Sequence, residues 1–180
     1  RLGWSHGDQE IFTLKEMRAL FDIADVNKSA SAINPDKLAW ISQQHMMRLP
    51  PSRIAVELRW QFERIGVDVA NGPPLESIVE AQRERAKTLK EMAQASLFFF
   101  RDPEIYEEKA ARKNFTAESM ALLRTTREAL AGLVDWSPPS IHALIEDLAG
   151  KAGVGLGKLA QPLRVAVSGG AVSPPIDQTL

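Results

Sequence analysis

The chain has 180 residues, of which 44% are hydrophobic and 25% charged, with a formal net charge of -1 and no cysteine. These values are typical of a globular protein with one large domain or two small ones, and they exclude a disordered or collagen-like chain. The lack of cysteine excludes disulfides and thiolate zinc sites and favours a reducing compartment, so we expect a cytoplasmic protein. The near-neutral charge argues against a protein that coats nucleic acid without specificity.

The ends of the chain and its hydropathy bear on targeting. The first residue is Arg1 rather than methionine, and no basic segment followed by an apolar one stands at the start. No apolar stretch approaches the ~20 residues that a membrane span requires. We therefore expect a fragment of a longer soluble chain that has no membrane partner.

Capping signals and prolines predict helices in the first half of the chain. Thr13 followed by Glu16 fits a capping box, so a helix should begin near Thr13. Asn34 before Pro35 predicts a second helix over 35–47, which Pro50 ends. Further helices are expected at 52–65, at 75–85 and from Thr88 to Asp102, with the break "NGPP" between the first two of these.

The second half of the chain is also predicted to be helical. The apolar spacing indicates helices over 116–134 and from 138 to the glycines at 150–153, the latter capped by Ser137. Only the stretch "LRVAVSG" has β-branched character. The expected fold class is therefore all-α, with eight to ten helices.

Two local clusters of positive charge stand out from the neutral total. The interval 148–176 holds Lys151, Lys158 and Arg164 and no acidic residue. A second cluster contains Glu84 among four basic residues: Arg83, Arg85, Lys87 and Lys90. Such clusters indicate a specific polyanionic partner, while solvated helix faces remain the alternative explanation.

A search for catalytic and metal-binding patterns finds no active site. The three histidines, His6, His45 and His142, lack the spacing of a helical metal pair. No nucleophile elbow, Walker loop or dinucleotide fingerprint occurs, and the glycines of "GVGLGK" follow a helix rather than a strand. We therefore expect no catalytic residue and no metal ligand, and we expect the run 98–100 and the four tryptophans to pack in a core.

Four strings, "LGWSHGDQEIFT", "VNKSASAINPDKLAWISQQHM", "KTLKEMAQ" and "GKLAQPLRVAVSGGAVSPPID", resemble the bacterial glutamyl-tRNA synthetases, which are class I aminoacyl-tRNA synthetases. The resemblance covers essentially all of the chain and lies downstream of the family's catalytic core. The HIGH-type and KMSKS-type signatures are absent, and the chain stops short of the family's final helix. The resemblance implies that ATP and Mg belong to the parent catalytic domain, and that the fragment holds no cofactor and does not aminoacylate by itself.

The family's layout implies three regions and a partner. Residues 1–49 resemble the end of the stem-contact region, 50–100 a first helical anticodon-binding subdomain, and 101–180 a second one, truncated at its C-terminus. The subdomains would meet near Phe98 to Asp102. The parent enzyme joins glutamate to its tRNA with ATP, so the implied partner is tRNA(Glu), with no DNA and with the protein as a monomer.

The resemblance also assigns residues to the RNA. Arg85 corresponds to the arginine associated with the third anticodon base, a cytosine, and Arg164 is the arginine of "QPLR". The family's anticodon-contacting loop falls on Ser173, Pro174 and Ile176, and possible phosphate contacts are Arg83, Lys87, Lys90, Lys151 and Lys158. Guanidinium groups suit splayed-out bases, and we expect Pro162 and the glycine pair at 169–170 to turn the backbone and leave Arg164 at the mouth of a pocket.

Three alternatives remain open. A helical protein-interaction module without RNA binding would share the neutral charge and the amphipathic helices. A nondiscriminating relative would also charge tRNA(Gln), whose third anticodon base is guanine; Arg85 favours the discriminating type but does not decide the matter. A glutamyl-queuosine-type paralogue is the third, although such proteins resemble the catalytic half and lack this helical tail.

Overall fold

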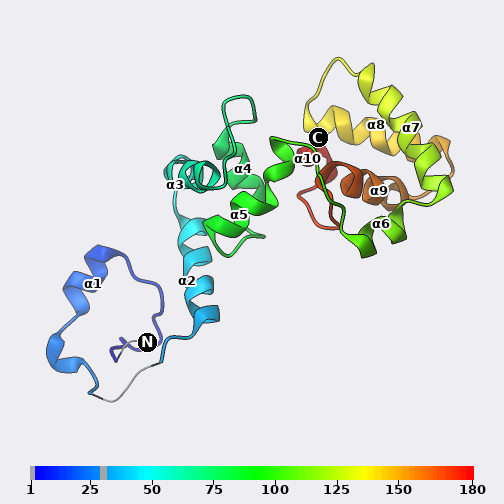
Figure 1. Cartoon of the computed structure of the whole chain (residues 1–180). Coiled ribbons are helices and arrows are strands. Elements are labelled where there is room, and N and C mark those ends of the chain that lie inside the picture. Colours follow the sequence, from blue (N-terminus) through cyan, green and yellow to red (C-terminus); the bar gives the residue numbers. More distant parts are fainter. Residues whose placement is uncertain (1–2, 29–31) are drawn as a thin grey trace.

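The computed structural model describes residues 3–28 and 32–180, so residues 1–2 and 29–31 of the expected first region lie outside it. The described residues form ten α-helices and two short 3-10 helices, with no β-strand (Figure 1). The all-α prediction is confirmed. No helix in these two stretches is long and apolar enough to cross a bilayer.

The N-terminal segment carries α1 (Leu14–Leu20) and the 3-10 helix η1 (Ile23–Asp25). The predicted capping box is present: the Thr13 N–H donates to Glu16 Oε2 at 2.6 Å, and the Glu16 N–H donates to Thr13 Oγ1 at 3.2 Å. No residue of α1 is buried. Trp4 instead packs against two other rings of the segment: its ring centroid lies 5.4 Å from that of Phe12 and 5.6 Å from that of Phe21.

Helices α2 (Pro35–Arg48) and α3 (Pro51–Arg64) join this segment to the rest of the chain, as Figure 1 shows. Asn34 Oδ1 accepts the N–H groups of Asp36 and Lys37, so the predicted start of α2 is confirmed. The two prolines after Leu49 separate the helices because proline cannot donate to the helical ladder. Gly66, at φ +70°, ends α3 as expected.

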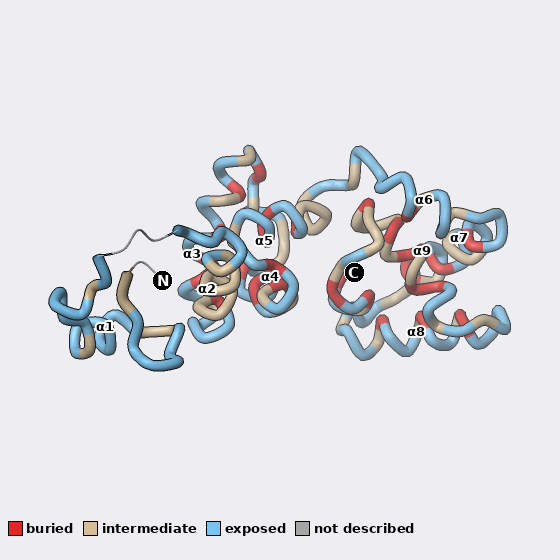
Figure 2. The backbone as a smooth tube through the Cα atoms, turned by 90° about the horizontal axis from the view of Figure 1, so that it is seen from below, coloured by how far each residue is buried: buried red, intermediate tan, exposed pale blue. Residues whose placement is uncertain are grey.

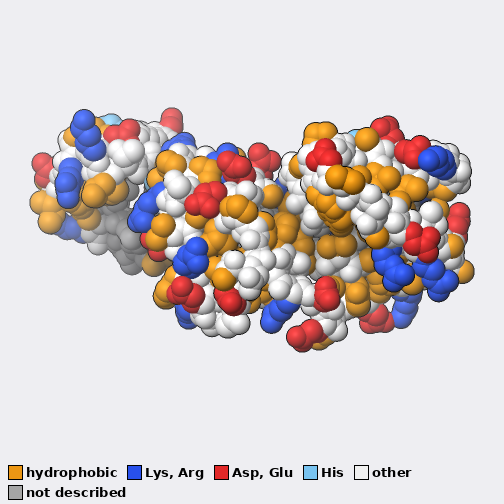
Figure 3. All heavy atoms as spheres, turned by 90° about the horizontal axis from the view of Figure 1, so that it is seen from above, with side chains coloured by type: hydrophobic (Ala, Val, Ile, Leu, Met, Phe, Trp, Pro, Cys, Tyr) orange, Lys and Arg blue, Asp and Glu red, His pale blue; other side chains and the backbone are white. Residues whose placement is uncertain are grey.

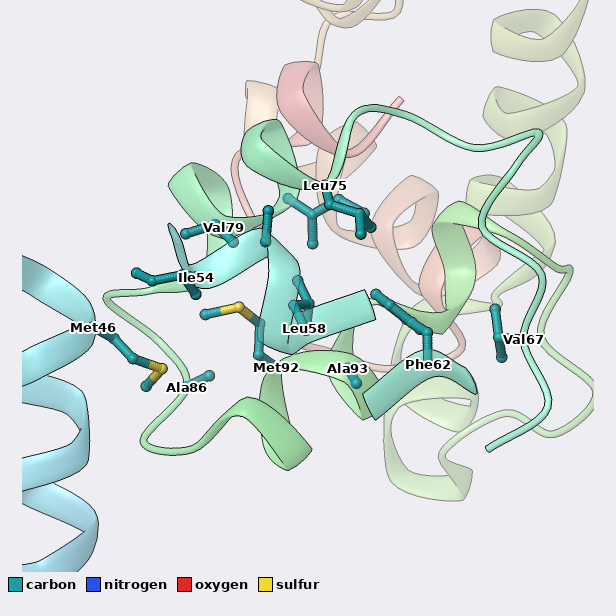
Figure 4. Packing of buried hydrophobic residues seen from close by; sticks show 12 residues of the cluster. Met46, Ile54, Leu58, Phe62, Val67, Leu75, Val79, Ala86, Met92 and Ala93 are labelled. Carbon is teal, nitrogen blue, oxygen red and sulfur yellow. The ribbon is translucent and has the colours of Figure 1, made fainter. Parts of the chain in front are cut away.

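The first helical body consists of α3, α4 (Leu75–Gln82), α5 (Leu89–Ala95) and the 3-10 helix η2 (Leu97–Phe99). Leu58, Phe62 and Met92 are fully buried at its centre, as Figure 4 shows. Helix α4 ends three residues before the predicted end because the chain turns, with the N–H groups of Arg85 and Ala86 both donating to Gln82 O at 2.9 Å. This turn places Ala86 in the buried hydrophobic cluster of the first body.

Aromatic residues close the first body. The Phe100 ring lies 4.8 Å from that of Phe62, and a Cβ at Gly72 would overlap it, so the loop 66–74 can cover this ring only with glycine there. Phe99 also packs against the cluster. The expectation that all four tryptophans pack in a core is wrong for Trp60 and Trp136, which are 51% and 50% exposed.

The second helical body consists of α6 (Glu108–Asn114), α7 (Ala117–Ala131), α8 (Pro138–Lys151), α9 (Leu156–Ser168) and α10 (Ile176–Thr179). Its own cluster centres on Ile141, Ile145 and Leu159, and Figure 2 shows buried residues gathered separately in the two bodies. The β-branched stretch lies within α9, where Val165 is fully buried, so tertiary packing overrides its local preference.

Two local expectations in the second body are corrected. Pro162 lies inside α9 and is buried, so it does not turn the backbone. Ser137 occupies the N-cap of α8, but its hydroxyl makes no capping bond; Asp135 Oδ1 accepts the Ser137 N–H instead, at 2.9 Å. The chain turns at Gly169, which has φ +77°.

Candidate nucleic-acid interface

A small cleft lies between the two helical bodies. It has a volume of about 130 Å³ and is lined from the first body by Gln82, Arg85, Ala86, Glu91 and Ala95 and from the second by Val172 and Ser173. The structure thus brings together two residues that the sequence assigned separately to RNA, Arg85 and Ser173. This pair defines the candidate site.

Arg85 is exposed in the turn that follows α4. Its Nη1 donates to Ala81 O at 3.1 Å, and the guanidinium forms no ion pair with a described residue. The next turn is held by Glu91, whose Oε2 accepts the Lys87 N–H at 2.9 Å while its own N–H donates to Thr88 Oγ1 at 3.1 Å. A guanidinium has five N–H donors, so most of those on Arg85 remain available to a ligand.

Arg164 has a different environment from the one expected. It is half-buried, and its Nε donates to Ser173 Oγ at 2.9 Å. Nη1 donates to Gln161 Oε1 at 2.6 Å, and Nη2 donates to Pro174 O at 3.4 Å. Arg164 is therefore bound to the loop in this structure rather than open at the mouth of a pocket, and it sets the position of Ser173.

The loop that carries Ser173 is held at its start, at Gly169 and Ala171. The Glu107 N–H donates to Gly169 O at 2.8 Å, and Glu107 Oε2 accepts the Ala171 N–H at 3.3 Å. Gln161 Nε2 donates to Ala171 O at 2.9 Å. Sequence reasoning missed the positioning roles of Glu107 and Gln161, because neither belongs to a local pattern with its partner.

The three predicted loop residues face different surroundings. Ser173 lines the cleft, and its Oγ lies 3.0 Å from Thr179 Oγ1. Pro174 and Ile176 are buried, and Ile176 belongs to the second body's core. Val172 lines the cleft, is 80% exposed and presents an apolar side chain to solvent. It lies just outside the range that the sequence indicated.

The five predicted phosphate contacts lie outside the cleft lining. Lys87 and Lys90 are exposed and Arg83 is half-buried, all on the first body. Lys151 pairs with Asp147 at 2.7 Å, while Lys158 lines a separate hollow in the second body. Within residues 3–28 and 32–180, no cluster of three or more histidines or acidic residues could hold a metal ion.

This all-helical architecture agrees with comparisons to known proteins. A family described as "Anticodon binding domain" matches residues 49–180, and the chain belongs to it. Over all 180 residues the chain is 58% identical to glutamate--tRNA ligase 1 of Alkalilimnicola ehrlichii and 56% identical to glutamate--tRNA ligase 2 of Halorhodospira halophila. It spans about 38% of the length of these curated relatives.

A solved structure supports the same assignment. The crystal structure of a glutamate tRNA ligase from Elizabethkingia meningosepticum, in complex with its amino acid, matches 99% of this chain and 36% of that one, with a TM-score of 0.85 and 30% identity. The ligase from Elizabethkingia anophelis matches with a TM-score of 0.81. The chain thus corresponds to the C-terminal, anticodon-binding portion of glutamate--tRNA ligases.

Proposed function

We propose that this chain reads the anticodon loop of tRNA(Glu), as part of a cytoplasmic enzyme that joins glutamate to its tRNA with ATP, and that it has no aminoacylation activity alone. The observation that carries the proposal is the cleft in which Arg85 and Ser173 lie together. We divide the chain accordingly into 1–49, 50–100 and 101–180, with the last two regions forming opposite walls of the cleft.

The chemistry of the cleft suits an unpaired base. Single-stranded RNA loops are recognised by splaying out bases and hydrogen-bonding their edges. The Watson–Crick edge of cytosine places two acceptors, O2 and N3, side by side, which matches a guanidinium that donates twice. The corresponding edge of guanine has an N–H donor between its other two groups. An arginine that donates twice would place one of its own N–H groups against that donor, which is unfavourable. Arg85 would thereby favour cytosine at the third anticodon position.

The test replaces Arg85 with glutamine and measures binding to two hairpin RNAs that differ only in the third anticodon base, cytosine or guanine. We expect the variant to lose about 1–3 kcal/mol of discrimination, or roughly 5- to 150-fold, because a bidentate base contact has that value. The matched control is Arg83→Gln, a predicted phosphate contact outside the cleft lining, which should leave the discrimination between the two RNAs unchanged.

The outcomes distinguish a base contact by Arg85 from a phosphate contact, and a discriminating ligase from a nondiscriminating one. An equal loss on both RNAs would make Arg85 a phosphate contact, because phosphates carry no sequence information. Equal affinity of the unmodified chain for both RNAs would instead support the nondiscriminating type of ligase. Unchanged binding of both RNAs by Arg85→Gln would contradict the assignment of Arg85.

A further inference from the structure

A second and larger concavity lies at the outer end of the second body. Its volume is about 780 Å³, and it is bounded by the end of α6, the start of α7 and the start of α9. Lysines enter it from two helices, Lys113 on α6 and Lys158 on α9. Figure 3 shows Lys and Arg side chains, with some acidic ones among them, at this end of the molecule. We call this concavity the hollow.

The two lysines of the hollow have no acidic partner in the described chain. Two other surface cations of the second body are neutralised, since Arg112 pairs with Glu108 at 2.6 Å and Lys151 with Asp147 at 2.7 Å. Lys113 and Lys158 are exposed and form no such pair with a described residue. Glu118 also lines the hollow without pairing with either lysine. The lining thus has a net positive charge.

The hollow is joined to the cleft through side chains of α9. In the series Lys158, Gln161 and Arg164 each residue is three positions from the next, so each side chain lies beside its neighbour, and the series winds about 120° around the helix. Gln161 lines the hollow and accepts from Arg164 at 2.6 Å, and Arg164 in turn donates to Ser173 in the cleft. At 1.5 Å per residue, Lys158 and Arg164 are about 9 Å apart along the helix axis. One RNA strand can therefore reach both places.

The glycines of "GVGLGK" keep the hollow open. Gly155 and Gly157 line it, and a Cβ added at either would meet no atom within 4 Å. A ligand backbone can approach the chain closely at this point without a side chain in the way. The motif therefore provides space beside Lys158.

We propose that the hollow binds the phosphate backbone of the same RNA whose bases enter the cleft, with Lys113 and Lys158 as the contacting cations. The inference rests on the proposed function, because it extends the RNA path from the cleft along α9. It predicts a contribution to affinity that depends on salt and is independent of base identity, since phosphate contacts position RNA without reading its sequence.

The first experiment measures binding of the 180-residue chain to the two hairpin RNAs over a series of salt concentrations. Lys113→Gln and Lys158→Gln should each weaken binding about 3- to 10-fold at low salt, equally for cytosine and guanine. Each should also flatten the slope of log affinity against log salt by about 0.7–0.9, the value of one lost phosphate contact. The control is Arg53→Gln on α3, an exposed cation that pairs with Glu57 and lies on the other body.

A second pair of variants separates binding from folding. Gly157→Glu places a carboxylate beside Lys158 in the first turn of α9, where a negative charge favours the helix, so the chain should fold normally and bind RNA at least 10-fold more weakly at low salt. Gly157→Gln, which adds a side chain of the same length without the charge, should weaken binding less than Gly157→Glu, so the difference between the two variants measures the effect of the charge. Unchanged affinity and slope in the lysine variants, or a loss confined to one RNA, would overturn the hollow as a phosphate site. A base-selective loss in Arg85→Gln would then still support the cleft, whereas no RNA binding by the unmodified chain would overturn both.

Discussion

At the scale of single residues, Gly169 is the point at which the chain turns from α9 into the loop that carries Ser173. Its φ of +77° lies in the left-handed region, and a Cβ there would approach Pro103 Cβ to 2.9 Å and Ile105 O to 3.0 Å. A residue with a Cβ would be strained by the left-handed φ and would also overlap these two atoms. The loop with Ser173 therefore depends on glycine at this position.

We expect Gly169→Ala to lower the free energy of unfolding by about 2–4 kcal/mol, the sum of left-handed strain and steric overlap. Gly66→Ala is the matched control, because Gly66 has a φ of +70° but open space around it, so it isolates the strain alone. Urea denaturation of both variants measures the difference. Equal losses would show that the overlap at Gly169 relaxes without cost.

At the scale of elements, the start of α8 depends on a carboxylate outside the helix. Hydrogen bonds from Ser140 and Ser137 hold the pKa of the Asp135 carboxyl below its ordinary value of 3.8. A depressed folded-state pKa stabilises the protein above the unfolded pKa, and this contribution is lost as the pH falls through the folded value.

Replacing Asp135 with asparagine should therefore lower the melting temperature at pH 7, because the charged acceptor of three donors is removed. The difference from the unmodified chain should shrink as the pH falls below about 3.8, because the carboxyl of the unfolded chain is protonated there first and that of the folded chain only at lower pH. Thermal melts from pH 7 down to pH 2.5 follow this difference. A difference that stays constant with pH would assign the loss to geometry rather than charge.

At the scale of the whole molecule, two hydrophobic clusters stabilise two helical bodies. The buried residues of the first cluster lie between Met46 and Ala93, and those of the second between Ile141 and Ile176. Because the clusters share no buried residue, we expect damage to one to remain largely confined to its own body.

Phe62→Ala should cost about 3–5 kcal/mol, since it removes a fully buried ring, and should speed amide hydrogen exchange in α3, α4 and α5. Exchange in α7, α8 and α9 should change little. Ile145→Ala is the reciprocal variant, with a cost of about 2–5 kcal/mol and faster exchange in the second body. Faster exchange throughout the chain in both variants would show that the two bodies unfold as one unit.

Local chemistry determined the parts of this protein that the sequence alone could predict. The starts of α1 and α2 follow from Thr13 with Glu16 and from Asn34 with Pro35, because each cap bonds groups two or three residues away. The all-α class follows from many such signals in agreement. The family resemblance likewise needed only the strings themselves, and it indicated Arg85 and Ser173 one by one.

Only the tertiary structure decided how distant residues combine. Residues 163–168 of the strand-like stretch are helical because Val165 is fully buried and Val167 packs against the second cluster, and Ile176 is buried in that same cluster. Arg164 donates hydrogen bonds to its own loop, because the chain turns at Gly169 and brings Ser173 and Pro174 back beside α9. Arg85 and Ser173 share a cleft because two separately packed bodies meet there. Such contacts depend on the packing of whole helices, which no capping signal or short motif encodes.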